Sequence, residues 1–227
     1  MDRVRATAVE AGRIRCHILE IVPGVPGTSL EVEGALDKLN PGAVAVDVDL
    51  LDVLSYRRSG GTGHVPLPFP AEVVRRALDG RGEEAEVQNP YQAAAVLARR
   101  RNVPLVPLLP ERTRPGWFLR RRLAREFARH ARDQEAHELT LLWSRVAHAD
   151  SAAKPLVERE DAETWRRFRD LVARDQAVRV VAVVRPPRAD ALASKLEAEL
   201  VPTTLRGGTI ALEDASLEPF EVGKGLR

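Results

Sequence analysis

The chain has 227 residues, of which 44% are hydrophobic, enough to bury one sizeable core. Its 35 Lys and Arg nearly balance its 33 Asp and Glu, so the net charge of +2 provides no overall field for a polyanion. The single cysteine, Cys16, excludes an intramolecular disulfide framework, and no apolar run is long enough to span a bilayer. We therefore expect a cytoplasmic protein, and its many Arg and Glu beside few Asn and Gln are typical of a heat-stable one.

The first half of the chain has the pattern of a strand-helix-strand unit. The apolar run at 14–22 ends at Pro23, as a buried strand does at a turn. Residues 28–39 begin with the spacing of a capping box, which predicts a short helix, and residues 43–49 predict a second strand. Two strands joined by a helix through short connections form a βαβ unit with parallel strands. This unit predicts the α/β class.

The remaining elements are predicted from hydrophobic spacing, caps and breakers. Helices are expected over 70–78, 90–101, 160–173 and 189–200, and strands over 103–109 and 178–184. Apolar residues recur at helical spacing over 115–148, which predicts one long amphipathic helix or two in series. Residues 201–227 carry little pattern and predict a short strand or a loose tail. The expected fold is a single domain over 1–227, with a mainly parallel central sheet flanked by helices.

Four blocks, in this order, resemble the TraB/PrgY (Tiki-like) family. They are the strand-turn-helix-strand unit at 18–49, ARRRNVPLVPLLPERT at 98–113, LVEREDAETW at 156–165 and RVVAVVRPPRADALASKLE at 179–197. Members of that family are regarded as metal-dependent peptidases or as inhibitors of peptide pheromones. The resemblance therefore implies an α/β fold and a role in cleaving or capturing a protein or peptide partner.

The chain departs from the family at both of the family's histidine motifs. The family's Gly-Thr-x-His falls on residues 23–26 and its Gly-x-x-His falls on residues 185–188, and neither segment contains a histidine. A Zn²⁺ or Mn²⁺ site needs about three ligands with lone pairs, which proline and guanidinium groups cannot provide. We therefore expect no metal centre and no cofactor.

The positions that match the family are acidic and ionic. Asp47 stands where the family has Glu, three residues match its Glu-Arg-Asp motif, and two match part of its Asp-Arg-Asp element. Those five residues are Glu158, Arg159, Glu160, Glu111 and Arg112. The resemblance implies that these groups hold the scaffold together.

Charged residues follow two of the predicted parallel strands. Asp47 and Asp49 end one strand, and Arg185 and Arg188 follow another, so both pairs are expected at the edge where open α/β sheets place ligand groups. Arginines facing carboxylates indicate either an internal salt-bridge network in place of the metal or a site for an anionic ligand. Asp49 alone is equally expected to cap a helix that begins at Leu50. The residues expected to bind are Asp47, Arg112, Arg159, Arg185 and Arg188.

One dense basic cluster lies in the predicted long helix. It consists of Arg120, Arg121, Arg122 and Arg125, and Trp117 and Phe118 precede it. Arginines with aromatic neighbours can bind nucleic acid or an acidic membrane surface, but a solvated helix face explains them equally without a partner. Acidic residues interrupt the positive charge, which makes nucleic acid an unfavoured partner.

These patterns favour a non-catalytic TraB-like binding or scaffolding protein. Its long helix has more apolar positions than one neighbour would bury, which predicts a homodimer. Two other classes stay open, a nucleic-acid-associated protein that uses the arginine cluster and a hydrolase acting on peptides. The hydrolase would bind a metal through oxygen alone. Its candidate catalytic residues are Asp47, Glu111, Glu158 and Glu160.

Overall fold

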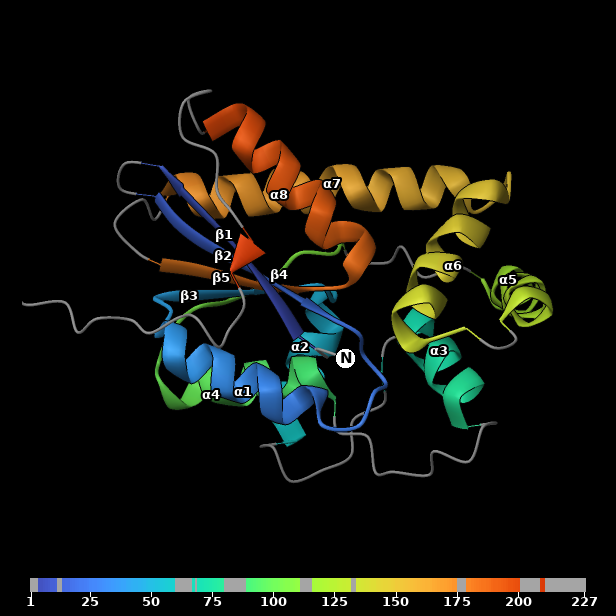
Figure 1. The fold of residues 1–227 in the computed structure, drawn as a ribbon, viewed down its shortest axis with the longest axis horizontal. Helices are drawn as coiled ribbons and strands as arrows, with labels where there is room; N and C mark the ends of the chain where they lie inside the picture. Colours follow the sequence, from blue (N-terminus) through green and yellow to red (C-terminus); the bar gives the residue numbers. More distant parts are fainter. Residues whose placement is uncertain are drawn as a thin grey trace, which may run out of the picture.

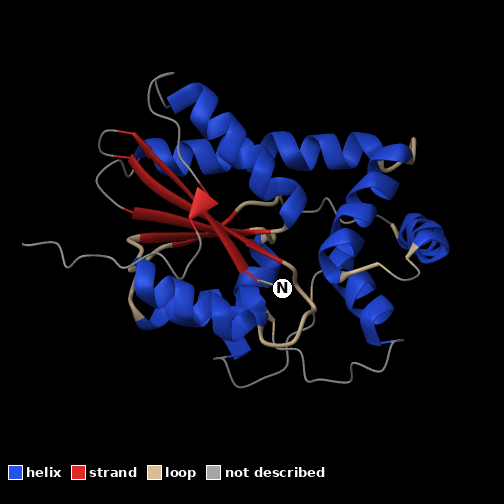
Figure 2. Cartoon of the chain, in the orientation of Figure 1, coloured by secondary structure: helices blue, strands red, loops and turns tan. Residues whose placement is uncertain are grey.

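The structure is a computed structural model that describes residues 4–11, 14–59, 67, 69–79, 89–110, 116–131, 134–174, 179–200 and 209–210. These residues form a six-stranded sheet in the order β4-β3-β5-β2-β1-β6, with helices on both faces (Figures 1 and 2). Its strands are β1 (Val4–Ala11), β2 (Ile14–Ile21), β3 (Ala43–Val46), β4 (Leu105–Pro107), β5 (Arg179–Val184) and β6 (Thr209–Ile210). Strands β4, β3, β5 and β2 are parallel to one another, while β1 and β6 are antiparallel to their neighbours. The predicted α/β class and mainly parallel sheet are confirmed.

The eight helices of the described residues occupy three regions of the molecule. They are α1 (Thr28–Leu39), α2 (Leu50–Ser59), α3 (Phe69–Asp79), α4 (Pro90–Arg100), α5 (Trp117–His130), α6 (Ala136–Ala149), α7 (Lys154–Arg174) and α8 (Pro186–Leu200). Helices α1, α2 and α4 cover one face of the sheet, and α7 and α8 cover the other. Helices α3, α5 and α6 form a third group beyond one end of the strands (Figure 1). Within the described part of the chain, no helix combines the length and the hydropathy that a membrane span requires.

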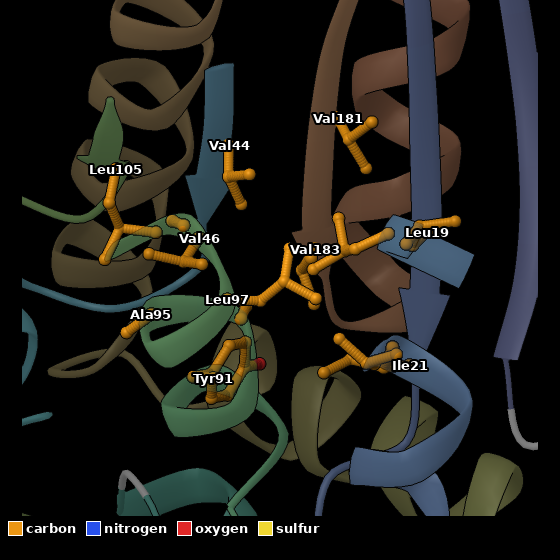
Figure 3. Packing of buried hydrophobic residues seen from close by; sticks show 14 of the residues in the cluster. Leu19, Ile21, Val44, Val46, Tyr91, Ala95, Leu97, Leu105, Val181 and Val183 are labelled. Carbon is orange, nitrogen blue, oxygen red and sulfur yellow. The ribbon is translucent and has the colours of Figure 1, made fainter. Parts of the chain in front are cut away.

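The strands are buried on both faces, because successive side chains of a strand point to opposite sides of the sheet. Val181 and Val183 of β5 pack with α1 and α4, whereas Val180, Ala182 and Val184 pack with α7 and α8. Figure 3 shows the first of these layers, in which side chains of four parallel strands meet helix α4. This two-sided burial is why the parallel strands appear in the sequence as continuous runs of Val, Ile and Leu.

Strand β1 is an element that the sequence analysis missed. Its buried residues include Ala6 and Ala8, which are small, while Arg5 and Glu10 are exposed. Alanine has a low preference for strands, so the alternation of buried and exposed positions is weak in the sequence. Pairing with β2 along the whole strand supplies the order that the local sequence does not.

The segment 115–148 does not form one long helix but two in series, α5 and α6. Glu135 begins α6 with a capping box in which it and Glu138 exchange hydrogen bonds with each other's backbone. Phe127 of α5 packs edge-to-face on Trp143 of α6, with ring centroids 5.8 Å apart. The capping box begins α6 as a separate helix, and the ring contact packs it against α5.

Most apolar positions of α5 and α6 are buried inside the chain, whereas Trp117 and Phe118 at the start of α5 are exposed. Leu123, Phe127, Leu139 and Leu142 contact one another and residues of α3, including Val74. These contacts account for the apolar residues that led us to expect a dimer interface on this segment. Of the predicted tail, only the two residues of β6 belong to the described part of the chain, where they pair with β1.

Candidate functional site

The carboxyl ends of β3 and β5 lie side by side, and the chain leaves them in opposite directions. After β3 it enters α2, on the face covered by α1 and α4, and after β5 it enters α8, on the other face. Neighbouring strands with this divergence leave a crevice at their carboxyl ends, which is where open α/β sheets place their ligands. Asp47 follows β3 and Arg185 follows β5, so both lie at this point of the sheet.

Asp47 is the centre of a buried ion network. Its side chain has no solvent exposure, and it accepts hydrogen bonds from Arg185 Nε at 2.7 Å and, through its other oxygen, from Arg188 Nη1. The backbone N–H of Arg185 donates a weaker bond at 3.4 Å. Burial alone would raise the pKa of Asp47, but the charges of Arg185 and Arg188 hold this pKa below its ordinary value. Asp47 is therefore a permanent carboxylate with both oxygens engaged.

Arg188 extends the network to helix α7. Its Nη2 donates to Glu160 at 2.9 Å and its Nε donates to Asp161 at 3.0 Å, so three carboxylates surround one guanidinium group. Burial alone would lower the pKa of Arg188, but Asp47, Glu160 and Asp161 together raise it. The network ties β3, α7 and α8 to one another at the carboxyl edge of the sheet.

A cavity of about 200 Å³ lies beside this network, between the carboxyl edge and helices α3, α6 and α7. Its apolar lining includes Val74, Trp143, Ala147 and Val157. Its polar lining includes Arg185, Arg188, Glu160, Asp161 and His148. A concave site with apolar walls and a few convergent charged groups is the usual form of a small-molecule site.

Two polar groups at this edge are incompletely satisfied. The hydroxyl of Tyr91 is fully buried and has no hydrogen-bond partner among the described residues. Burial first, and then the charge of Asp47, raise the pKa of Tyr91 well above its ordinary value, so this hydroxyl is neutral. Arg185 uses its Nε on Asp47, and no described residue accepts from its Nη1 or Nη2, although its side chain is only 13% exposed.

Ser144, His148 and Asp161 of the cavity wall have the residue types of a hydrolytic triad but not its geometry. His148 Nδ1 lies 2.8 Å from the carbonyl oxygen of Ser144 and 3.3 Å from its hydroxyl oxygen. Because a carbonyl oxygen can only accept, Nδ1 must carry the proton, and it cannot then take one from the serine. On the other side, His148 Nε2 lies 3.7 Å from Asp161. The arrangement caps the last turn of α6 and does not activate a nucleophile.

The structure brings together some of the residues that the sequence singled out and separates others. Asp47, Glu160, Arg185 and Arg188 form the network, as the alternative of an internal salt-bridge network predicts. Glu158 lies exposed on α7, where it pairs with Lys154 at 3.8 Å.

Arg159 is likewise exposed on α7, and no described contact joins it to the network, so its predicted part in binding stays a prediction. Glu111 and Arg112 lie outside the described residues. Asp49 does cap α2, since its side chain accepts from the backbone N–H of Asp52 at 2.9 Å.

Three of the four proposed carboxylate ligands, Asp47, Glu158 and Glu160, belong to the described part of the chain, and these three do not assemble into a metal site. Both oxygens of Asp47 are engaged by arginine, Glu160 also pairs with arginine, and Glu158 lies apart from them. No group of three His, Cys, Asp or Glu residues suited to a metal ion occurs among the described residues. The residues at this edge do not fit the metal centre that the family resemblance implies.

The arginine cluster lies on the outer face of α5. Trp117 and Phe118 are 60% and 83% exposed, and the guanidinium of Arg121 lies 5.2 Å from the centre of the Trp117 ring. Arg122 pairs with Asp150 at 2.5 Å. Arg120 is half-buried and also has interactions within the protein. Arg121, Arg122 and Arg125 are exposed to solvent, as the interpretation of a solvated helix face predicts.

Sequence reasoning missed Asp161, His148 and Tyr91, all of which lie at the carboxyl edge. Asp161 directly follows Glu160, and on a helix two successive residues point about 100° apart, so its role was not visible from spacing.

Comparison with protein-family models, with curated proteins and with solved structures finds no match. The carboxyl edge and its cavity are therefore the features that indicate what this chain does.

Proposed function

We propose that this chain is a non-catalytic, TraB-like binding protein that holds a small ligand in the cavity beside Asp47, Arg185 and Arg188. The observation that carries the proposal is the state of Asp47, a buried carboxylate with both oxygens bonded to arginine at the ligand-binding edge of the sheet. The oxygens of Asp47 therefore serve the internal ion network and are not available to bind a metal ion. The cavity beside it supplies the concave apolar surface that a ligand needs.

The same contacts argue against a hydrolase at this edge. A general base needs a pKa near the working pH, whereas the pKa of Asp47 lies below its ordinary value. A nucleophile needs a base that can accept its proton, and His148 does not offer one to Ser144. Positioning and binding are the roles that remain for these groups.

The partners expected from the sequence belong to the same proposal. A homodimer, a protein or peptide partner and a cytoplasmic setting remain predictions. The outer face of α5 gives weaker support for association with nucleic acid, because Arg122 is paired with Asp150 and Arg129 with Glu126.

The absence of a functional metal requirement can be tested by metal analysis together with thermal unfolding in EDTA and in added Zn²⁺, Mn²⁺ and Mg²⁺. We expect the purified protein to carry metal far below one equivalent and its melting temperature to be the same in EDTA as in buffer. Stoichiometric metal, or a melting temperature that falls in EDTA, would contradict the proposal and favour the hydrolase.

A further inference from the structure

The two terminal nitrogens of Arg185 are the first sign of what the cavity binds. The side chain is largely buried and lines the cavity, Nε bonds to Asp47, and no described residue accepts from Nη1 or Nη2. Donors without a protein partner on a cavity wall are open to a ligand, and a carboxylate can accept from both nitrogens of a guanidinium at once. Arg185 therefore presents a site for an anionic group.

The charges around the cavity exclude a ligand that is only an anion. Two guanidinium groups, those of Arg185 and Arg188, stand against three carboxylates, those of Asp47, Glu160 and Asp161. The network is already one charge negative, so a further uncompensated negative charge in a half-buried space would be repelled. A ligand that brings a positive group together with its carboxylate leaves this balance unchanged.

The acidic wall of the cavity can receive that positive group. Glu160 uses Oε2 on Arg188, and no described residue donates to its Oε1. Asp161 uses Oδ1 on Arg188, and its Oδ2 lies 3.7 Å from the nearest ring nitrogen of His148, longer than a hydrogen bond. Each carboxylate therefore has one oxygen open as an acceptor. Together the two oxygens can accept two of the three N–H donors of an ammonium group.

The size and the apolar wall of the cavity limit the rest of the ligand. A volume of about 200 Å³ corresponds to about seven water molecules of about 30 Å³ each, below the range of drug-sized sites. Val74, Trp143, Ala147 and Val157 form an apolar surface that suits a short aliphatic side chain. We infer that the cavity binds a free zwitterionic amino acid with an aliphatic side chain, its carboxylate on Arg185 and its ammonium between Glu160 and Asp161. This inference rests on the proposed function and names its ligand class.

Calorimetric titration of the full chain with three matched probes tests this assignment. L-Leucine carries both charges, 4-methylpentanoate lacks the ammonium group, and 3-methylbutylamine lacks the carboxylate. Each charged group makes charge-assisted hydrogen bonds, so each truncated probe should bind at least about tenfold more weakly than leucine.

Two substitutions to leucine locate the binding site. Ala147 is buried in the cavity wall, whereas Ala149 lies exposed two residues away on the same helix. Ala147→Leu should fill the cavity and reduce leucine binding at least about tenfold, while Ala149→Leu should leave it unchanged. Val157→Phe, from the opposite helix, provides a second blocked cavity if Ala147→Leu fails to fold.

The outcomes separate this inference from the function on which it rests. If leucine binds no better than 4-methylpentanoate, or no better than 3-methylbutylamine, the inference that the ligand is a zwitterion is wrong. The proposal that the cavity binds a small ligand would still stand. Leucine binding that survives in both folded cavity variants would overturn the site. No binding of any probe would overturn the ligand class, and a protein that also loses stability in EDTA would contradict the proposed function itself.

Discussion

At the scale of single residues, Asp47 determines the character of the carboxyl edge. Its carboxylate is the counter-charge of Arg185 and one of three counter-charges of Arg188. Bringing charged groups out of water is costly, and the cost is offset only while each charge keeps its partners. The network therefore contributes more to a defined arrangement of β3 and α8 than to net stability.

Replacing Asp47 with Ala should be strongly destabilising, by about 3–5 kcal/mol in the free energy of unfolding, because it leaves buried arginine without its carboxylate. Asp37→Ala is a matched control, since Asp37 pairs with Arg101 at an exposed position and should cost about 0–1 kcal/mol. Chemical denaturation of both variants measures the difference. Equal losses of stability in the two variants would contradict this expectation, because breaking the buried network would then cost no more than breaking an exposed ion pair.

The pH dependence of the same residue has a defined sign. The pKa of Asp47 is lower in the folded chain than its ordinary value of 3.8, so its stabilisation is fully present above that value. It is lost as the pH falls through the lower folded pKa. The difference in stability between wild type and Asp47→Asn should therefore shrink below about pH 3.8, and a constant difference would contradict the ion network.

At the scale of elements, hydrophobic runs and caps predicted most of the helices and strands. The run RVVAVV was found because a parallel strand buried on both faces is apolar throughout. The helix predicted over 90–101 does begin at Pro90, and the side chain of Asn89 caps it by accepting from the backbone N–H groups of Tyr91 and Gln92. Strand β1 was missed because its pairing with β2, not its local residues, defines it. For 115–148 the sequence left open one helix or two in series, and the structure has two, α5 and α6.

The cap of α4 also positions the edge, because Asn89 holds the helix turn that carries Tyr91 and donates to the Tyr56 hydroxyl at 3.3 Å. Asn89→Ala should lower the free energy of unfolding by about 1–2 kcal/mol, since it removes the cap and leaves buried groups unpaired. Asn89→Asp keeps the acceptor and should lose less. Thermal or chemical unfolding of the two variants checks this order. A larger loss of stability in Asn89→Asp than in Asn89→Ala would show that the cap does not matter.

At the scale of the whole molecule, topology brings distant parts of the sequence to one place. Asp47 and Arg188 are far apart in the chain and meet because β3 and β5 are neighbours in the sheet, and α7 brings Glu160 to the same place. That Asp47 and Arg185 would share an edge could be predicted, since both follow parallel strands. The cavity could not be predicted, because it depends on how α6 packs against α7 and the sheet.

The central claim is that the carboxyl edge holds a small organic ligand in place of a metal ion. Native mass spectrometry of the purified full chain tests it in one experiment, since the mass reports any bound metal and any bound small molecule. The account predicts a protein free of metal that takes up one leucine per chain, with the uptake lost in Ala147→Leu and kept in Ala149→Leu. A stoichiometric metal adduct that EDTA removes, together with no leucine adduct, would contradict it.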